Sequence, residues 1–266
     1  MIFLLTDDII YIKMISSCKY YLLKEQVDLM TNHIQYPMPA GTQPWAVRER
    51  HRSRRRKVLQ LPRYSVREEI FNGITHGIGA IGAVAALLIL VHRASGREET
   101  ASVGIFSGSM ILLYLISCLY HSLKVGRAKK VFQVLDHCTI YLLIAGTYTP
   151  ITLLAFPHPK GVILCAVTWS VAAIGILMNA IDMRRFRIAS MVCYLCLGWM
   201  VLLFLPDILT SCTSYELLML FLGGICYTLG AVLFGLGTKI PYMHGVFHLF
   251  CIAGSIFHFL MIYHLL

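Results

Sequence analysis

The chain ends in the stretch YMHGVFHLFCIAGSIFHFLMIYHLL, which covers residues 242–266. This stretch holds no Asp, Glu, Lys or Arg, and it exceeds the ~20 residues that an α-helix needs to cross the hydrocarbon core of a membrane. Six further apolar stretches precede it: Ile74–Val91, Ile105–Leu123, Leu135–Phe156, Val162–Ile181, Met191–Leu205 and Leu217–Leu236. The shortest, Met191–Leu205, can extend upstream to Arg187 or past Pro206.

The composition agrees with a membrane location for these stretches. Only 14% of the residues are charged, whereas 58% are hydrophobic, and the mean hydropathy is +0.71. Soluble domains carry roughly 25% charged residues, so an ordinary soluble domain is excluded. No alternating strand pattern competes with the apolar runs. The sequence therefore predicts an all-α integral membrane protein that forms a bundle of seven transmembrane helices.

Basic side chains are concentrated in every second connection between the apolar stretches. They lie before the first stretch and after the second, fourth and sixth: Arg48, Arg50, Arg52, Arg54, Arg55, Arg56, Lys57, Arg63 and Arg67; Lys124, Arg127, Lys129 and Lys130; Arg184, Arg185 and Arg187; and Lys239. Connections rich in Lys and Arg stay on the cytoplasmic side of a membrane. We therefore predict a cytoplasmic N-terminus and a C-terminus outside, which requires an odd number of spans.

Residues 1–63 are predicted to form a basic, poorly ordered cytoplasmic extension ahead of a membrane domain over residues 64–266. The segment from Arg48 to Lys57 has the charge to bind nucleic acid. Beside a membrane bundle, we expect it to contact anionic lipid headgroups instead, with no nucleic-acid partner. The first residues lack the basic flank of a signal peptide. We expect a multi-pass protein of the plasma (inner) membrane.

Two histidines lie at the start of the last apolar stretch. His244 and His248 are four residues apart, a spacing that places both imidazoles on one face of a helix. Ser117 and His121 repeat this spacing near the end of the second stretch. Neutral imidazole is a preferred ligand of zinc, and ionisable groups inside a membrane are functional candidates. The alternative is a pair of interfacial histidines that hydrogen-bond neighbouring helices.

The predicted orientation brings several polar groups to one depth near the cytoplasmic face. They are Ser117 and His121 at the end of the second stretch, Asp136 at the start of the third, His244 and His248 at the start of the seventh, and Glu68, Glu69 and Asn72 ahead of the first. The three histidines His121, His244 and His248 would make a zinc site. Three protein nitrogens leave the fourth tetrahedral position of zinc for water, as in catalytic sites, and the pKa of such water falls to near 7.

Asp136 and Ser117 are the candidate catalytic residues beside this site. The Asp136 carboxylate can accept the proton of the water or orient it, and the Ser117 hydroxyl can hydrogen-bond the water or an oxyanion. The alternative for Asp136 is an ion pair with Lys129 or Lys130 at the interface. Two glycine pairs, Gly73-x-x-x-Gly77 and Gly104-x-x-x-Gly108, predict close helix packing.

Five motifs together resemble the hemolysin III family, a branch of the progestin and adipoQ receptor group that is related to alkaline ceramidases. They are REEIFNGITHGIG (67–79), LYHS (119–122), LDH (135–137), LLIAGTYTP (142–150) and IPYMHGVFHLF (240–250). The resemblance covers roughly Tyr64 to Leu266. Two features depart from it: the long basic extension, and Met243 and Gly245, where the resemblance leads us to expect Asn and Ala.

The resemblance implies a Zn²⁺ site of His121, His244 and His248, with Ser117 and Asp136 as close neighbours, and the same N-inside topology. His76, Asn72 and Glu69 are the candidate outer neighbours of the ligands. For His76, an interhelical hydrogen bond is the alternative.

The resemblance to relatives and the membrane position of the site lead us to expect a zinc-dependent hydrolase of a lipid amide or ester bond, with a membrane lipid as substrate. A membrane-perturbing or pore-forming protein, as the hemolysin name suggests, and a receptor with structural zinc are the alternatives. A pore should line one helix face with polar groups through the whole bilayer depth. Here the polar groups cluster at the cytoplasmic end, which disfavours a channel.

The alternation of basic connections generates a topology test. A reporter that is active only in the cytoplasm should give no signal when fused after Leu266, and truncation after Lys239 should restore the signal. The reason is that each Arg or Lys resists translocation, at ~2.5–3.5 kcal/mol per residue at a helix centre. The reverse pattern of signals would overturn the topology and the placement of the site in the inner leaflet.

Overall fold

The computed structural model describes Ser53, Leu59, residues 61–237 and residues 240–266. The predicted lipid-binding segment from Arg48 to Lys57, Ser53 aside, and the basic residue Lys239 lie outside the described residues. The bundle belongs to the compact unit Arg55–Leu266. Within the described part of this unit, all regular structure is helical.

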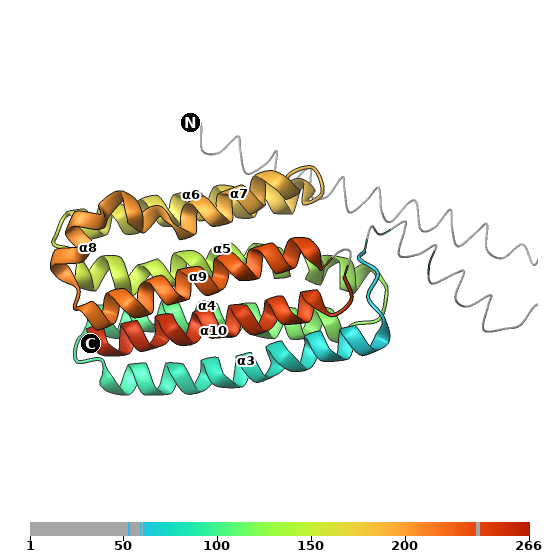
Figure 1. The fold of residues 1–266 in the computed structure, drawn as a ribbon, viewed down its shortest axis with the longest axis horizontal. Coiled ribbons are helices and arrows are strands. Elements are labelled where there is room, and N and C mark those ends of the chain that lie inside the picture. The colour runs from blue at the N-terminus through green and yellow to red at the C-terminus, as the bar shows by residue number, and fades with distance from the viewer. Residues whose placement is uncertain (1–52, 54–58, 60, 238–239) are drawn as a thin grey trace, which may run out of the picture. The chain divides into compact units, whose positions relative to one another are not determined.

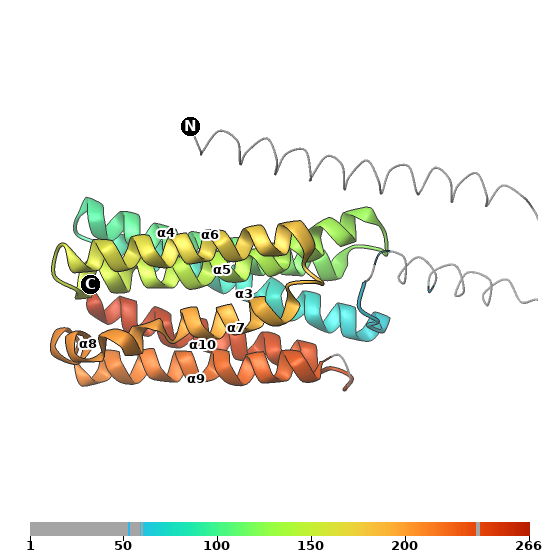
Figure 2. The same ribbon diagram turned by 90° about the horizontal axis from the view of Figure 1, so that it is seen from above.

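Long helices run side by side through this part of the chain (Figures 1 and 2). In order, they are α3 (Val66–Arg93), α4 (Arg97–Ser122), α5 (Arg127–Ala155), α6 (Lys160–Asp182), α7 (Arg187–Gly198), the 3₁₀ turn η1 (Met200–Phe204), α8 (Leu205–Ser211), α9 (Ser214–Leu236) and α10 (Met243–Leu265). Seven helical segments are long and apolar enough to cross a membrane. The prediction of a seven-helix membrane bundle is confirmed.

The fifth span is composite. It combines α7, η1 and α8 into the segment Arg187–Ser211, so the short apolar stretch extends in both directions allowed by the sequence. Pro206 lies in the first turn of α8, where its missing N–H costs no helical hydrogen bond. The break in the helix therefore falls before the proline, over the 3₁₀ turn.

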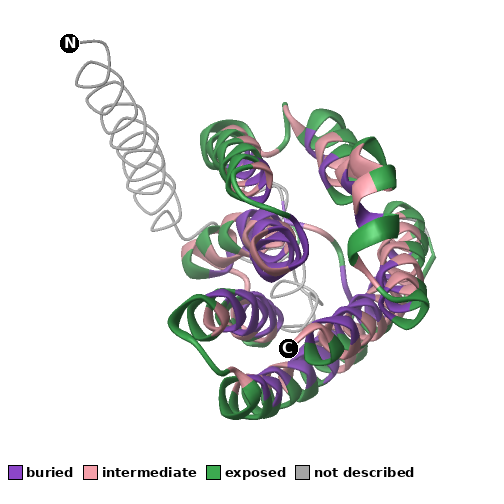
Figure 3. Ribbon diagram, turned by 90° about the vertical axis from the view of Figure 1, so that its left-hand side faces the viewer, coloured by how far each residue is buried: buried purple, intermediate pink, exposed green. Residues whose placement is uncertain are grey.

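The outer surface of the bundle is apolar, as a lipid environment requires. On α3, Ile74, Ile78 and Ile81 expose more than half of their surface. Figure 3 shows exposed residues on the outside of the helices and buried residues on the faces that the helices turn toward one another. Polar side chains lie on these inner faces. The hydroxyl of Ser255, for example, lies 2.5 Å from the Tyr114 hydroxyl and 2.7 Å from that of Tyr227.

The helices that carry the candidate site meet at one end of the bundle. Helices α3 to α6 each pack on the next, α9 packs on α10, and α10 also packs against α3, so the last span lies beside the first. The start of α3, the end of α4, the start of α5 and the start of α10 all lie at the same end in Figure 1. This confirms that the first, second, third and seventh spans bring their polar residues to one level.

Two local features fix the junction between α3 and α10. Ser65 and Glu68 form a capping box that begins α3, and the same Glu68 carboxylate accepts a hydrogen bond from the backbone N–H of Tyr242 at 3.1 Å. Tyr242 has φ +64°, in the left-handed region, directly before α10. The carboxylate therefore joins the first turns of two helices that are distant in sequence.

The glycine pairs behave differently from each other. A Cβ on Gly73 would lie 3.8 Å from the Cys118 carbonyl oxygen, and one on Gly77 would lie 3.5 Å from the Cys118 sulfur, as close packing of α3 on α4 predicts. A Cβ on Gly104 or Gly108 would meet no atom within 4 Å among the described residues. The prediction of close helix packing at that pair is therefore wrong. The second pair lies on a face of α4 that no described helix approaches.

Candidate metal centre

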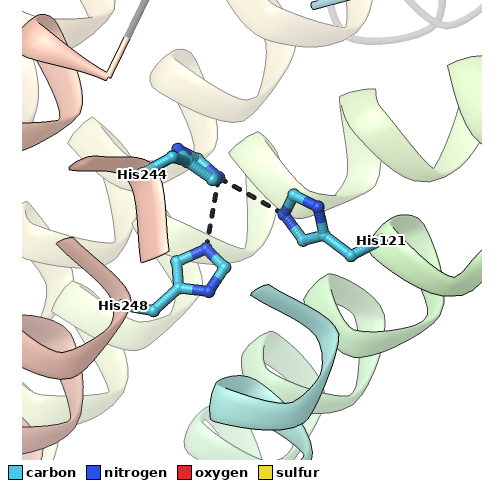
Figure 4. A group of neighbouring side chains, drawn as sticks. All are labelled: His121, His244 and His248. Atoms are coloured by element: carbon cyan, nitrogen blue, oxygen red, sulfur yellow. Dashed lines mark hydrogen bonds between the residues drawn. The ribbon is translucent and has the colours of Figure 1, made fainter. Parts of the chain in front are cut away.

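Three buried imidazoles converge between α4 and α10 (Figure 4). His121 comes from the last turn of α4, and His244 and His248 come from successive turns at the start of α10. The His244 Nε2 atom lies 3.3 Å from Nε2 of His121 and 3.2 Å from Nε2 of His248. The residues expose between 1% and 6% of their surface, so all three rings are buried within the bundle.

The spacing of these nitrogens fits a tetrahedral metal ion. Zinc binds imidazole nitrogen at about 2.0–2.1 Å, and a tetrahedron with such bonds separates its ligand atoms by about 3.3 Å. The two measured nitrogen distances of 3.3 and 3.2 Å match this value, and one nitrogen from each histidine lies within 4.8 Å of the others. The cluster could therefore hold a metal ion.

The hydrogen-bond partners of the Nδ1 atoms explain why the Nε2 atoms of His121 and His248 face the centre of the cluster. His121 Nδ1 lies 2.9 Å from the Glu69 carboxylate, which can only accept, so Nδ1 carries the proton. His248 Nδ1 lies 3.2 Å from the backbone carbonyl of Asn72 and 3.1 Å from the Thr75 hydroxyl. In both of these rings the Nδ1–H donates outward and leaves the Nε2 lone pair for a metal, an orientation that the outer partners of metal-binding histidines typically fix.

Glu69 and Asn72 thus lie where the sequence placed them, directly behind the predicted ligands. His76 also contacts a ligand, but by stacking: its ring lies 3.6 Å from that of His248, at an interplanar angle of 11°. Among the described residues, neither ring nitrogen of His76 has a hydrogen-bond partner, so the alternative of an interhelical hydrogen bond is not met.

The candidate catalytic residues lie on the neighbouring helices. Ser117 is completely buried one turn before His121, and its hydroxyl has no hydrogen-bond partner of acceptable geometry in the described part of the chain. Asp136, on α5, is close enough to Ser117, His121 and Lys129 to interact with each of them electrostatically. The Ser117 hydroxyl is therefore within reach of the Asp136 carboxylate, and both groups lie beside the three histidines.

Two functional neighbours were missed by the sequence reasoning. The Tyr64 ring stacks on His244, with centroids 5.0 Å apart, and lies 5.8 Å from His121. Burial, together with the carboxylates of Glu69, Asp136 and Glu68, raises the pKa of the Tyr64 phenol, which therefore stays protonated. Tyr64 lies in the irregular segment before α3, so helical periodicity could not predict that it contacts the site.

The second missed residue is Lys129, in the first turn of α5. Its Nζ atom lies 3.0 Å from the Glu69 carboxylate, and its side chain is only 3% exposed. The sequence analysis considered Lys129 and Lys130 as topology signals and as ion-pair partners of Asp136, not as partners of Glu69. Lys129 binds Glu69, while its charge still acts on Asp136, and Lys130 donates to the Gln133 side chain at 3.0 Å.

Local packing also explains one departure from the expected motif. The chain carries Gly245 where the resemblance leads us to expect Ala. A Cβ at this position would overlap the Phe71 ring and would lie 2.7 Å from Oδ1 of Asn72. Glycine lets α10 approach α3 closely enough for the Asn72 carbonyl to reach His248.

The sequence of this chain is similar to known proteins, and the similar region includes the candidate site. The family model described as "Haemolysin-III related" matches residues 64–259, which include all three histidines. Hemolysin-3 of Bacillus cereus is 42% identical over 193 residues, covering 71% of this chain and 88% of the relative. The hemolysin-3 homolog of Bacillus subtilis (strain 168) is 37% identical over 195 residues, 72% and 91% of the two chains. Monocyte to macrophage differentiation factor of Homo sapiens is 25% identical over 202 residues, 74% and 83%.

The convergence of the three Nε2 atoms predicts metal binding that depends on each histidine. Purified protein should carry about one transition-metal ion per chain, and His121→Ala, His244→Ala or His248→Ala should each remove most of it, since two protein ligands hold such an ion poorly. Elemental analysis of the monodisperse fraction measures this. His258→Ala is the matched control, because His258 is a buried histidine of α10 that contacts the Leu220 carbonyl instead. Wild-type protein without stoichiometric metal would contradict the prediction.

Proposed function

This chain belongs to the haemolysin III family of multi-pass membrane proteins, and from that premise we propose that it is a zinc-dependent hydrolase of lipid amide or ester bonds. The observation that carries the proposal is the set of three inward-facing Nε2 atoms next to a buried hydroxyl and a carboxylate. A hydroxyl and a carboxylate beside the metal are the groups that a hydrolytic site needs for oxyanion stabilisation and proton transfer.

The donor set supports zinc as the ion. All three donors are imidazole nitrogens, and the described residues place no thiolate in the cluster. Imidazole suits zinc, and three protein ligands with one open position are typical of catalytic zinc sites. A zinc ion held there supplies a Lewis acid and a water whose pKa is lowered toward neutrality.

The residues of the chain have separate roles in such a hydrolysis. The Ser117 hydroxyl donates a hydrogen bond to the substrate carbonyl oxygen as negative charge develops on it. The Asp136 carboxylate accepts a proton from the attacking water and returns it to the leaving group. Glu69 and the Asn72 carbonyl hold His121 and His248 in orientation. The Tyr64 ring covers His244 and limits the access of bulk water.

The position of the site supports a lipid as the substrate. The site lies at one end of a bundle whose outer faces are apolar, so the acyl chain of a lipid can lie along these faces. By the predicted topology, this end faces the cytoplasm. We place the protein in the plasma membrane, with its basic segment from Arg48 to Lys57 against anionic headgroups.

A membrane-perturbing activity is the second candidate, because both Bacillus relatives are named after hemolysin-3. The clustering of polar groups at one end of the bundle was the argument against a pore. In the structure, polar groups are not confined to this end, since Tyr114, Ser255 and Tyr227 lie deeper. However, these hydroxyls hydrogen-bond one another across the helix interfaces, so they are used in packing rather than left to line a pore. A receptor with structural zinc is the third candidate.

Replacement of Asp136 separates the enzyme from the other candidates. Asp136→Asn should keep the metal but lower hydrolysis of lipid amides or esters by about 10²-fold or more, because the amide cannot accept a proton. Metal content, thermal stability and hydrolysis of a panel of labelled lipid amides and esters are measured on the same samples. Asp207→Asn is the control, since Asp207 pairs with Lys160 outside the candidate site.

Each other outcome of this experiment has a defined meaning. Loss of both metal and fold in Asp136→Asn would make Asp136 a structural support and would contradict its catalytic role. Retained metal with unchanged hydrolysis would remove Asp136 from the mechanism. Wild-type protein that holds zinc, hydrolyses no lipid of the panel and releases dye from vesicles would favour the membrane-perturbing function.

A further inference from the structure

A lysine buried behind the metal centre has no role in the mechanism above. The Lys129 residue is only 2% exposed. Its Nζ atom contacts the Glu69 carboxylate at 3.0 Å and the backbone carbonyls of Tyr120 and Leu123 at 2.9 and 3.1 Å. These carbonyls belong to the C-terminal end of α4, where the helix leaves its last C=O groups without internal partners.

The position of Lys129 is unfavourable for its own helix. It lies in the first turn of α5, which holds no acidic residue and where the helix dipole disfavours positive charge. Burying an ion pair also stabilises a fold little, because desolvation offsets the attraction between the charges. A buried Lys at this point therefore requires an explanation other than the stability of α5.

Two contacts of Lys129 lead to one candidate metal ligand, His121. The Glu69 oxygen Oε2 that Lys129 contacts is the same atom that lies 2.9 Å from Nδ1 of His121. The Tyr120 carbonyl that it binds belongs to the residue before His121. One ammonium group thus holds both the carboxylate behind the imidazole and the backbone that carries the imidazole.

We propose that Lys129 is a positioning residue of the metal centre, which fixes His121 through Glu69 and through the end of α4. Without the ammonium, the Glu69 carboxylate loses the partner that holds it against Nδ1 of His121, and the final turn of α4 is free to fray. The His121 ring then departs from the direction in which its Nε2 meets those of His244 and His248. The proposal concerns metal binding, so it stands or fails separately from lipid hydrolysis.

Metal affinity of the Lys129→Met variant tests the proposal. Methionine keeps the apolar stem of lysine and removes the charge and the donors. We expect zinc affinity, measured by chelator competition on full-length protein in detergent, to fall 10- to 100-fold, as is typical when partners behind a metal ligand are removed. The visible spectrum of the Co²⁺-loaded protein should change as well. Lys130→Met is the matched control, because Lys130 is the next residue and contacts Gln133 rather than the site.

A double variant distinguishes positioning from general stabilisation. If Lys129 acts through Glu69, the affinity of Lys129→Met combined with Glu69→Gln should be close to that of Glu69→Gln alone, because residues of one network are not additive. If Lys129→Met does not fold, Lys129→Gln replaces it, since the amide keeps donors for the α4 carbonyls and lacks the charge. A lowered melting temperature with unchanged zinc affinity and Co²⁺ spectrum would show that Lys129 only caps α4, and would overturn the proposal.

Discussion

Three imidazole lone pairs that meet inside a membrane bundle are the constraint on which the rest of the structure depends. The Nδ1–H groups of His121 and His248 are donated outward, so the Nε2 lone pairs of these two rings face the cluster, where Nε2 of His244 lies 3.3 and 3.2 Å from them. The surrounding structure maintains this arrangement. The packing of α10 on α3, the close approach at Gly245 and the contacts behind the rings all serve to hold these nitrogens together.

The fold was predictable because the membrane imposes simple rules. Length and apolarity predict seven spans, and the alternation of basic connections predicts a topology that brings His121, His244 and His248 to one level. Helical spacing alone paired His244 with His248. The sequence correctly predicted that the fifth span can extend beyond the apolar stretch Met191–Leu205. The 3₁₀ turn over Met200–Phe204 within this span has no clear signal in the sequence.

The features that the sequence did not predict depend on tertiary contacts, which helical periodicity does not determine. Tyr64 lies in an irregular segment before α3, and its stacking on His244 follows from how that segment folds back. Lys129 was counted as a topology signal, since a basic residue in a loop ordinarily faces water or headgroups, yet it is buried against Glu69. The spacing of Gly104 and Gly108 matched a packing motif, but a spacing cannot show whether a neighbouring helix is present. Such residues are placed by tertiary structure.

X-ray absorption spectroscopy at the zinc edge of the purified, full-length protein tests the central claim most directly, because it reports the identity and distance of the ligands without any variant. The account predicts a zinc signal with three imidazole nitrogens at about 2.0–2.1 Å and one further light atom from outside the chain. A sulfur shell near 2.3 Å would place the zinc on cysteines elsewhere. Either that result or protein without a zinc signal would contradict a metal centre at His121, His244 and His248.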